Sequence, residues 1–335
     1  MLKSKIMKVQ HIIGADLSKK TIDVFSHSSG QHLCFENNEA GFKVLMQWLE
    51  EEGSALSQTA IVMEHTGLYS YLFEKFLHRN SMVFVKVAAL EILKSQGVTR
   101  GKSDKIDAKR IALYGFEKQH KLKATEQIQE SLVRLKMLNT VRSGLVKQKV
   151  AIKCSIKEFK NIGLKNSDMI IKGQENVLKL LEKQIADLEL ETEKIIKENS
   201  GLNNNYKYLR SVRGVGHVTA VVTIIKTGNF TKFDNGRQFS CYCGTAPFEY
   251  SSGTSFKGRT RISHLADKEM KTLLDLAARS AMQHDPELKQ YYQRRLSDGK
   301  SKRSTINIIR NKLIHRMFAV IKRQEPFVDG YINAA

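Results

Sequence analysis

The chain has 335 residues, and its 55 lysine and arginine residues against 34 aspartate and glutamate residues give a formal net charge of +21. This charge favours a polyanionic partner, nucleic acid above all, over a small neutral substrate. Because the apolar stretches are too short to span a bilayer, no signal peptide is evident and four scattered cysteines give no disulfide framework, we expect a cytoplasmic protein.

The first 122 residues alternate short apolar runs with segments of helical periodicity. This order predicts an α/β domain built on a central sheet. We expect strands at 12–16, 21–26, 60–64 and 82–87, and helices at 41–52, 69–80 and 104–116.

Four acidic residues stand at the ends of these elements. Asp16 and Glu64 each end a strand, and Asp104 and Asp107 lie one turn apart at the start of a helix that Ser103 can cap. Taken alone, the two acids at the start of the helix are explained by their favourable interaction with the helix dipole. All four together suit Mg²⁺ or Mn²⁺, because hard oxygen ligands prefer these ions and two such ions can clamp a phosphodiester.

Residues 123–202 carry apolar side chains at helical spacing, which predicts a long antiparallel helical pair or coiled coil. The pattern fits an intramolecular spacer and a coiled coil between two protomers equally well. Asn203 to Asn205, after Gly201, are expected to break the helical pair and to begin a third region, 203–335.

The third region opens with a helix, a turn containing Gly214 and Gly216, and a second helix. Such a turn can present main-chain N–H groups to a phosphate, as in helix-hairpin-helix modules, but an ordinary helix junction fits as well. Further on, Cys241 and Cys243 form a C-x-C pair without the further ligands of a zinc site, so we expect them to be small apolar residues of a strand.

The segment Gly244 to Gly253 reads GTAPFEYSSG and leads into a basic loop. From chemistry alone, its serines fit a phosphate contact better than a nucleophile. Basic residues of this loop and of the C-terminal helices are expected to bind phosphates. They are Lys257, Arg259 and Arg261, followed by Arg294, Arg295, Lys300, Lys302, Arg303, Arg310, Lys312 and Arg316.

Taken in order, GADLSKKTIDV, MEHTGLY, KSDKIDAKRIA and GTAPFEYSSG resemble the DEDD transposases of bacterial insertion sequences, the IS110 family. The resemblance spans nearly the whole chain. It implies a ribonuclease H-like (RuvC-like) domain at 1–122, a coiled coil at 123–202 and a mainly helical transposase domain at 203–335. The chain departs from the usual pattern at 87–89, where a proline is common, and at 266–267, where Gly-Asn is common.

The resemblance also implies roles for particular residues. Asp16, Glu64, Asp104 and Asp107 would be the catalytic acids that hold Mg²⁺ or Mn²⁺, and Ser252 would be the nucleophile that forms a 5′-phosphoserine. The implied partners are donor and target DNA and a structured non-coding guide RNA. A homodimer or homotetramer, associated with the bacterial nucleoid, would complete the site between protomers.

Two alternatives to this function stay open. One is a RuvC-like, metal-dependent nuclease that hydrolyses branched DNA with water and has no covalent intermediate. The other is a non-catalytic nucleic-acid scaffold whose acids are helix caps and surface charges.

Overall fold

The computed structural model describes residues 9–67, 69–97, 101, 103–125, 129–249, 251–252, 256–258 and 260–329, with the backbone alone at 252, 256 and 257. Gly253, at the end of the segment GTAPFEYSSG, and Arg259, in the basic loop that follows, lie outside these residues. The chain divides into two compact units, residues 1–127 and 128–335. The predicted division into three parts, 1–122, 123–202 and 203–335, stays a prediction.

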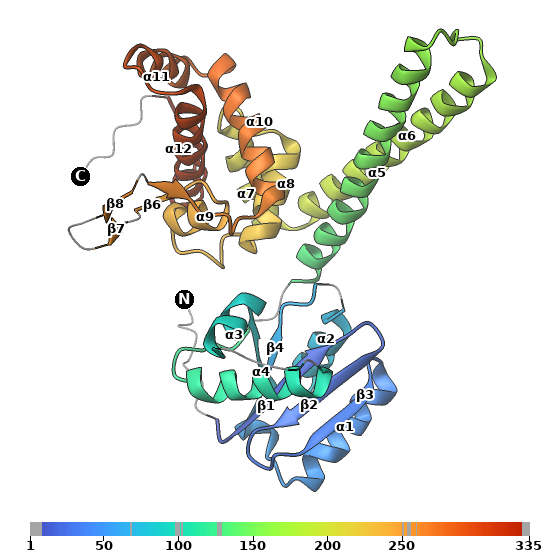
Figure 1. Ribbon diagram of the computed structural model, residues 1–335, viewed down its shortest axis with the longest axis vertical. Coiled ribbons are helices and arrows are strands. Elements are labelled where there is room, and N and C mark those ends of the chain that lie inside the picture. The colour runs from blue at the N-terminus through green and yellow to red at the C-terminus, as the bar shows by residue number, and fades with distance from the viewer. Residues whose placement is uncertain are drawn as a thin grey trace. The chain divides into compact units, whose positions relative to one another are not determined.

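The first unit is a five-stranded sheet of order β3-β2-β1-β4-β5 with helices packed on it (Figure 1). Strands β1, β2 and β3 pair antiparallel, and β1, β4 and β5 pair parallel. The elements are β1 (His11–Leu17), β2 (Thr21–Ser26), β3 (His32–Glu36), α1 (Glu39–Glu51), a 3₁₀ turn (Leu56–Gln58), β4 (Thr59–Glu64), α2 (Tyr71–Arg79), β5 (Val83–Val87), α3 (Ala89–Ser95) and α4 (Asp104–Lys118).

Both faces of this sheet are buried, and each has its own apolar core. Ile13, Ile61 and Phe42 belong to the core beneath α1 and α2, whereas Ile12 and Ile111 belong to the core beneath α4. The predicted strands and helices are confirmed within about two residues. Strand β3 and helix α3 were not predicted, because each buries only one side chain and so shows no clear periodicity.

The second unit is mainly helical. It consists of α5 (Glu130–Asn161), α6 (Met169–Glu198), α7 (Ser200–Ser211), α8 (His217–Thr227), α9 (Gly236–Tyr242), β6 (Pro247–Phe248), β7 (Ser251–Ser252), β8 (Phe256–Lys257), β9 (Arg261–Ile262), α10 (Lys268–His284), α11 (Pro286–Ser297) and α12 (Lys302–Arg323). None of its described helices, nor any of the first unit, is long and apolar enough to cross a membrane.

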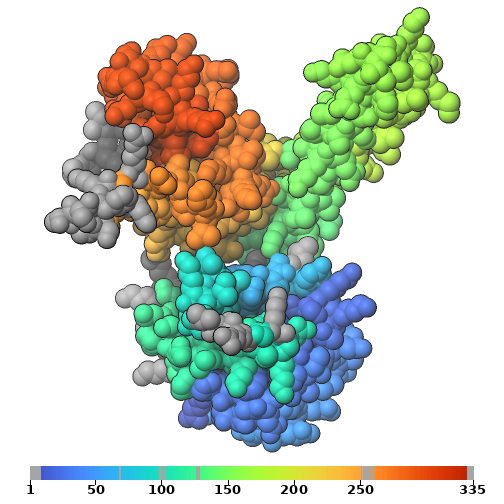
Figure 2. Space-filling view, in the orientation of Figure 1, coloured from blue at the N-terminus to red at the C-terminus, as the bar shows by residue number. Residues whose placement is uncertain are grey.

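Helices α5 and α6 form the predicted antiparallel pair (Figure 1), and their residues are drawn in green in Figure 2. Arg142 of α5 donates to Glu189 of α6 at 2.7 Å, and Lys149 lies 3.0 Å from Glu182. The partner numbers fall along α6 as they rise along α5, so the two helices run in opposite directions. Whether they form a coiled coil with a second protomer stays a prediction.

The predicted helix break at Asn203 to Asn205 is wrong, because these residues lie inside α7. The break falls at Asn199, whose side chain accepts the main-chain N–H of Leu202 at 3.1 Å and so caps α7. Asn205 is tolerated within the helix because its side chain is buried and donates to that of Asn229 at 2.8 Å.

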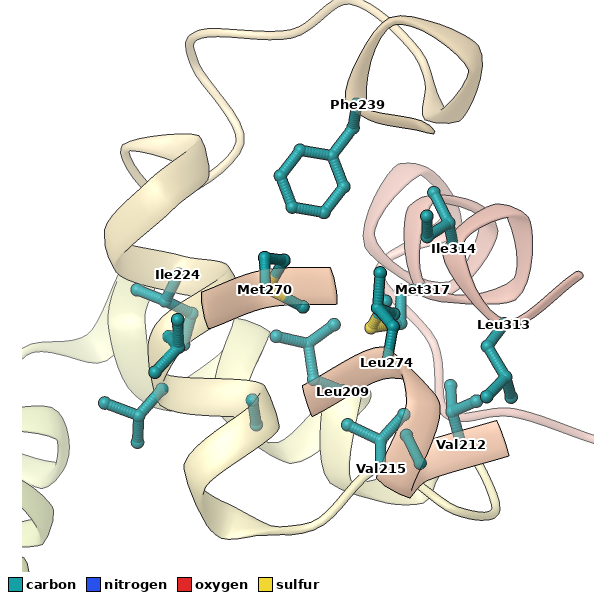
Figure 3. Close-up of a cluster of buried hydrophobic side chains, with 14 of the residues drawn as sticks. Leu209, Val212, Val215, Ile224, Phe239, Met270, Leu274, Leu313, Ile314 and Met317 are labelled. Atoms are coloured by element: carbon teal, nitrogen blue, oxygen red, sulfur yellow. The ribbon is translucent and has the colours of Figure 1, made fainter. Parts of the chain in front are cut away.

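The core of the second unit joins helices that are far apart in sequence, and Figure 3 shows its centre. Leu209 of α7, Met270 of α10 and Met317 of α12 are fully buried there. The strand predicted at Cys241 and Cys243 is also wrong: Cys241 lies in α9 and Cys243 follows it directly. The side chain of Asn235 caps α9, and of the two cysteines only Cys243 is buried.

Candidate active site

The first two predicted acids stand at the carboxyl ends of neighbouring parallel strands. The register of β1 and β4 ends with Ala15 opposite Met63. Asp16 and Glu64 are the next residues along the two strands, so they come level with each other, and both are partly exposed. Level residues on adjacent strands point to the same face of a sheet. The strands therefore deliver the two carboxylates to one face.

Helix α4 covers the face to which these acids point. Gly14 lies two residues before Asp16, and side chains two apart on a strand share a face. A Cβ atom at Gly14 would lie 2.2 Å from the main-chain oxygen of Ala108 and from the main-chain nitrogen of Ala112, both in α4. The backbone of the helix thus rests directly on the backbone of β1. This approach is possible only because residue 14 has no side chain.

The second pair of acids lies on the first turn of this helix. Ser103 caps α4 as predicted, its hydroxyl accepting a main-chain N–H of the first turn. Asp104 is exposed, whereas Asp107 is partly buried and accepts a 2.8 Å hydrogen bond from Arg110 Nη1. Asp107 directly precedes Ala108, the residue that touches β1 at Gly14, so the helix carries this acid to the strand end.

The electrostatics of Asp16 connect this acid with the other three. The pKa of Asp16 is raised to about 6. Burial of its carboxyl is the largest cause, followed by the negative charges of Asp107, Asp104, Glu64 and Asp23. The other three predicted acids and a fifth acid, Asp23, are therefore near enough to act on the charge of Asp16.

The donor set of this acid cluster fits a hard divalent cation by its chemistry. Carboxylate oxygens are the ligands that Mg²⁺ and Mn²⁺ prefer, and a cation would relieve the repulsion that raises the pKa of Asp16. Within the described ranges, however, no three Asp, Glu, His or Cys side chains are gathered tightly enough to hold one ion. The carboxylates would therefore have to close around a cation on binding.

The fifth acid, Asp23, was missed in the sequence. It lies opposite Asp16 in the β1–β2 ladder and is only 8% exposed. The local pattern gave no signal, because Asp23 alternates with the apolar Ile22 and Val24 as a solvent-facing strand residue would. Gly14 was missed as well, since only the packing of α4 reveals why a glycine stands there.

Cys34, on the neighbouring strand β3, offers a test of cation binding. Burial raises the pKa of its thiol, and so do the charge and the hydrogen bond of Asp23 and the charge of Asp104. Mg²⁺ bound among the acids should offset these charges, lower the thiol pKa and speed alkylation of Cys34 at pH 8 by iodoacetamide. Peptide mapping by mass spectrometry measures the rate, with exposed Cys154 as the internal control. An equal Mg²⁺ effect on both thiols would contradict the prediction.

The predicted nucleophile lies in the second unit, on a short strand. Ser251 and Ser252 form β7, which pairs with Phe256 and Lys257 of β8. The structure describes the backbone of Ser252 and Lys257 but not their side chains, and Arg259 lies outside the described residues. Arg261 is exposed on β9. The roles of these residues stay predictions.

The glycine turn between α7 and α8 has a packing role. Gly214 has a φ of +90°, and a Cβ atom there would lie 2.5 Å from the main-chain oxygen of Ala277 in α10. Gly214 thus allows the turn to rest on α10. Gly216 is the N-cap residue of α8. Close packing accounts for Gly214, and phosphate binding by this turn stays a prediction.

Two of the arginines predicted to contact phosphates are held in ion pairs of the helical core. Arg310 pairs with Asp275 of α10. Arg316 Nη1 lies 2.5 Å from Oδ2 of the buried Asp285. Both arginines therefore join α12 to its neighbouring helices.

The sheet order and the placement of the acids define a class of protein. Acids on the ends of β1 and β4 and on the helix that covers them, over a sheet of order β3-β2-β1-β4-β5, form a carboxylate site on a ribonuclease H-like domain. Enzymes of this class act on the phosphodiester backbone of nucleic acids.

Comparison with known families identifies the protein further. Residues 13–159, which include the four predicted acids, match the transposase family of IS110 DEDD enzymes. Residues 206–293 match the family described as "Transposase IS116/IS110/IS902 family". The chain therefore belongs to the IS110-family transposases.

Individual relatives agree with this assignment. The chain is similar to the pilin gene-inverting protein of Moraxella bovis, with 27% identity over 331 residues that cover 94% of this chain and 97% of the relative. The pilin gene-inverting protein of Moraxella lacunata matches over the same length with the same identity. The transposase for insertion sequence element IS1111A of Coxiella burnetii is 26% identical over 149 residues, 44% of this chain and 40% of that protein.

Proposed function

We propose that this transposase cuts and rejoins DNA through a covalent phosphoserine, with Mg²⁺ held by Asp16, Glu64, Asp104 and Asp107 and with Ser252 as nucleophile. The observation that supports this proposal is the raised pKa of Asp16, which results from burial and from the nearby charges of Asp107, Asp104 and Glu64. When bound there, Mg²⁺ would supply positive charge that activates the scissile phosphate and stabilises the leaving oxygen.

Rejoining distinguishes this proposal from the alternative, a hydrolytic nuclease. The two Moraxella relatives, which match nearly the whole chain, are named for inverting a gene. Inversion requires that the cut DNA ends be joined again in the opposite orientation. A covalent enzyme–DNA bond conserves the energy of the broken phosphodiester for that joining, whereas attack by water loses it.

The proposed chemical step is a transesterification. The Ser252 hydroxyl oxygen attacks phosphorus, the Oγ–P bond forms and the bond from phosphorus to the 3′ oxygen breaks. The hydroxyl proton passes to a base, and the 3′ oxygen takes up a proton to become a free 3′-hydroxyl. Reversal of the step, with a different 3′-hydroxyl as the attacking group, joins the DNA.

The proposal includes the partners that the resemblance implies. They are donor and target DNA and a structured non-coding guide RNA, and the net charge of +21 suits both kinds of polyanion. A recombinase acting on two duplexes makes several strand cuts, so a dimer or tetramer is expected. Helices α5 and α6 support association of protomers because Val141, Val150 and Leu180 are each more than half exposed.

A trapping assay tests the function. Wild type, Ser252→Ala, Ser251→Ala and Asp16→Asn are incubated with Mg²⁺, junction DNA of the element and its non-coding RNA, and protein joined to labelled DNA is detected on a denaturing gel. We expect an adduct with wild type and with Ser251→Ala, and none with Ser252→Ala or Asp16→Asn. Ser251→Ala is the matched control because it alters the neighbouring residue of the same strand.

Two results would count against the proposal. An adduct that persists in Ser252→Ala but disappears in Ser251→Ala would move the nucleophile by one residue. DNA cleavage without any adduct, unchanged in Ser252→Ala, would favour the hydrolytic nuclease. Omission of the RNA from the wild-type reaction tests guidance: we expect the adduct to be lost, and an adduct formed equally well without RNA would exclude guidance from the cutting step.

A further inference from the structure

Asp23 is a buried acid that the proposed reaction does not use. Its carboxylate projects to the α4 face of the sheet, level with Asp16 across the antiparallel β1–β2 ladder. Phe25, two residues further on, confirms this direction, because it packs against Ala108 and Ala112 of α4. Asp23 therefore lies on the same face as the acid cluster and directly beside its central member.

Two side chains of β3 hold Asp23 in place from the other side. His32 Nε2 lies 2.8 Å from Asp23 Oδ1, and the thiol of Cys34 donates to Asp23 Oδ2 at 3.5 Å. The side chains of His32 and Asp23 are 19% and 12% exposed. Burial of a carboxylate costs free energy unless donors compensate for the lost water, and the histidine supplies such a donor when Nε2 carries the proton.

We propose that Asp23, oriented by His32, is a positioning residue of the acid cluster. Asp23 adds a fixed negative charge beside Asp16 and so raises the affinity of the cluster for a divalent cation. This inference rests on the proposed function, since it presumes that the cluster binds Mg²⁺ or Mn²⁺. It assigns to strands β2 and β3 a part in the site, which otherwise involves only β1, β4 and α4.

The pKa values of two residues beside Asp23, Asp16 and Cys34, support this arrangement. The charge of Asp23 is one of the causes that raise the pKa of Asp16. Burial, the charge and hydrogen bond of Asp23, and the charge of Asp104 raise the pKa of the Cys34 thiol. Asp23 therefore lies near enough to the cluster for its charge to act on Asp16, and Cys34 feels the charges of both Asp23 and Asp104. Groups that support the ligands of a metal ion typically change its affinity by tenfold or more when they are removed.

A second buried ion pair of the same unit provides a matched control. Lys86 of β5 and Glu74 of α2 are both 11% exposed and lie 2.5 Å apart. Lys86 is level with Met63, a residue of the core beneath α1 and α2, so this pair occupies the opposite face from Asp23. Loss of Glu74 should destabilise the fold without changing the affinity for a cation.

The test is a calorimetric titration of the full-length protein with Mn²⁺, in the absence of nucleic acid. We expect Asp23→Asn to weaken Mn²⁺ binding about tenfold and His32→Ala to weaken it about threefold. His32→Gln should restore affinity because its amide nitrogen can take the place of Nε2. Glu74→Gln should bind as wild type does although its melting temperature falls.

The outcomes separate this inference from the proposed function. Wild-type affinity in Asp23→Asn, with binding lost in Asp16→Asn, overturns the role of Asp23 and leaves the metal site intact. No Mn²⁺ binding by wild type overturns both. If Asp23→Asn does not fold, the His32 variants decide: equal affinity in His32→Ala, His32→Gln and wild type overturns the inference.

Discussion

Substitution of Asp16 by asparagine is expected to abolish DNA cleavage and, at the same time, to stabilise the metal-free protein at pH 8. Asp16 is the member of the cluster on which all the other acids act. Loss of its charge should therefore remove the cation and slow cleavage at least about 10³-fold. Single-turnover cleavage of labelled junction DNA, with the RNA and Mg²⁺ present, measures this loss.

The effect on stability follows from the pKa of Asp16, which rises from 3.8 to about 6 on folding. A group whose pKa is raised in the folded state binds protons more tightly there, so its ionisation destabilises the fold as the pH rises from about 4 through 6. Asparagine avoids this cost. Because Asp16 is only half-buried, solvent screening reduces the expected gain to about 1 kcal/mol at pH 8.

Thermal unfolding at pH 5 and pH 8, with and without Mg²⁺, measures the stability. Without the cation, Asp16→Asn should melt above wild type at pH 8, and the difference should shrink as the pH falls toward 5. With Mg²⁺, wild type should gain stability and the variant should not. A variant that melts below wild type at pH 8 without Mg²⁺ would show that Asp16 is a structural residue and not a strained member of a charged site.

Much of the acid cluster could be predicted because each acid follows a strong local signal. Asp16 and Glu64 end apolar runs that are long enough to be buried strands, and Ser103 marks the start of α4. Local signals of this kind survive in the fold because strand ends and helix caps depend on few distant contacts.

The errors arose where distant contacts decide the structure. Asn203 and Asn205 are typical of loops, yet α7 continues through them because Asn199 caps it and Asn229 satisfies the buried amide of Asn205. Asp23 has the pattern of an ordinary strand residue until the ladder sets it opposite Asp16. Pairings of this kind join residues from different strands, and a local pattern does not contain them.

Gly14 belongs to the same group and gives the second large prediction. A methyl group at this position would lie 2.2 Å from main-chain atoms of α4, which cannot rotate away as a side chain can. Gly14→Ala should therefore push α4 off the sheet and lower the free energy of unfolding by about 3 kcal/mol. Because α4 carries Asp104 and Asp107, cation binding and cleavage should be lost although every acid is present.

Alanine substitutions at two other glycines provide a graded comparison with Gly14→Ala. A Cβ atom at Gly115 of α4 would meet the Cγ2 of Val62 at 2.7 Å, so the contact is with a side chain. Gly144 of α5 has no atom within 4 Å of such a Cβ. Urea unfolding should show a small loss for Gly115→Ala and a gain of about 1 kcal/mol for Gly144→Ala, since alanine favours helix.

The order of the three variants in cation binding is the sharper result. Gly144→Ala should bind Mn²⁺ as wild type does, Gly115→Ala should bind it more weakly, and Gly14→Ala should not bind it. If Gly14→Ala kept wild-type affinity, the acids of α4 would not depend on contact between the helix and β1. The proposed metal site would then tolerate movement of α4, and the placement of Asp104 and Asp107 would require another explanation.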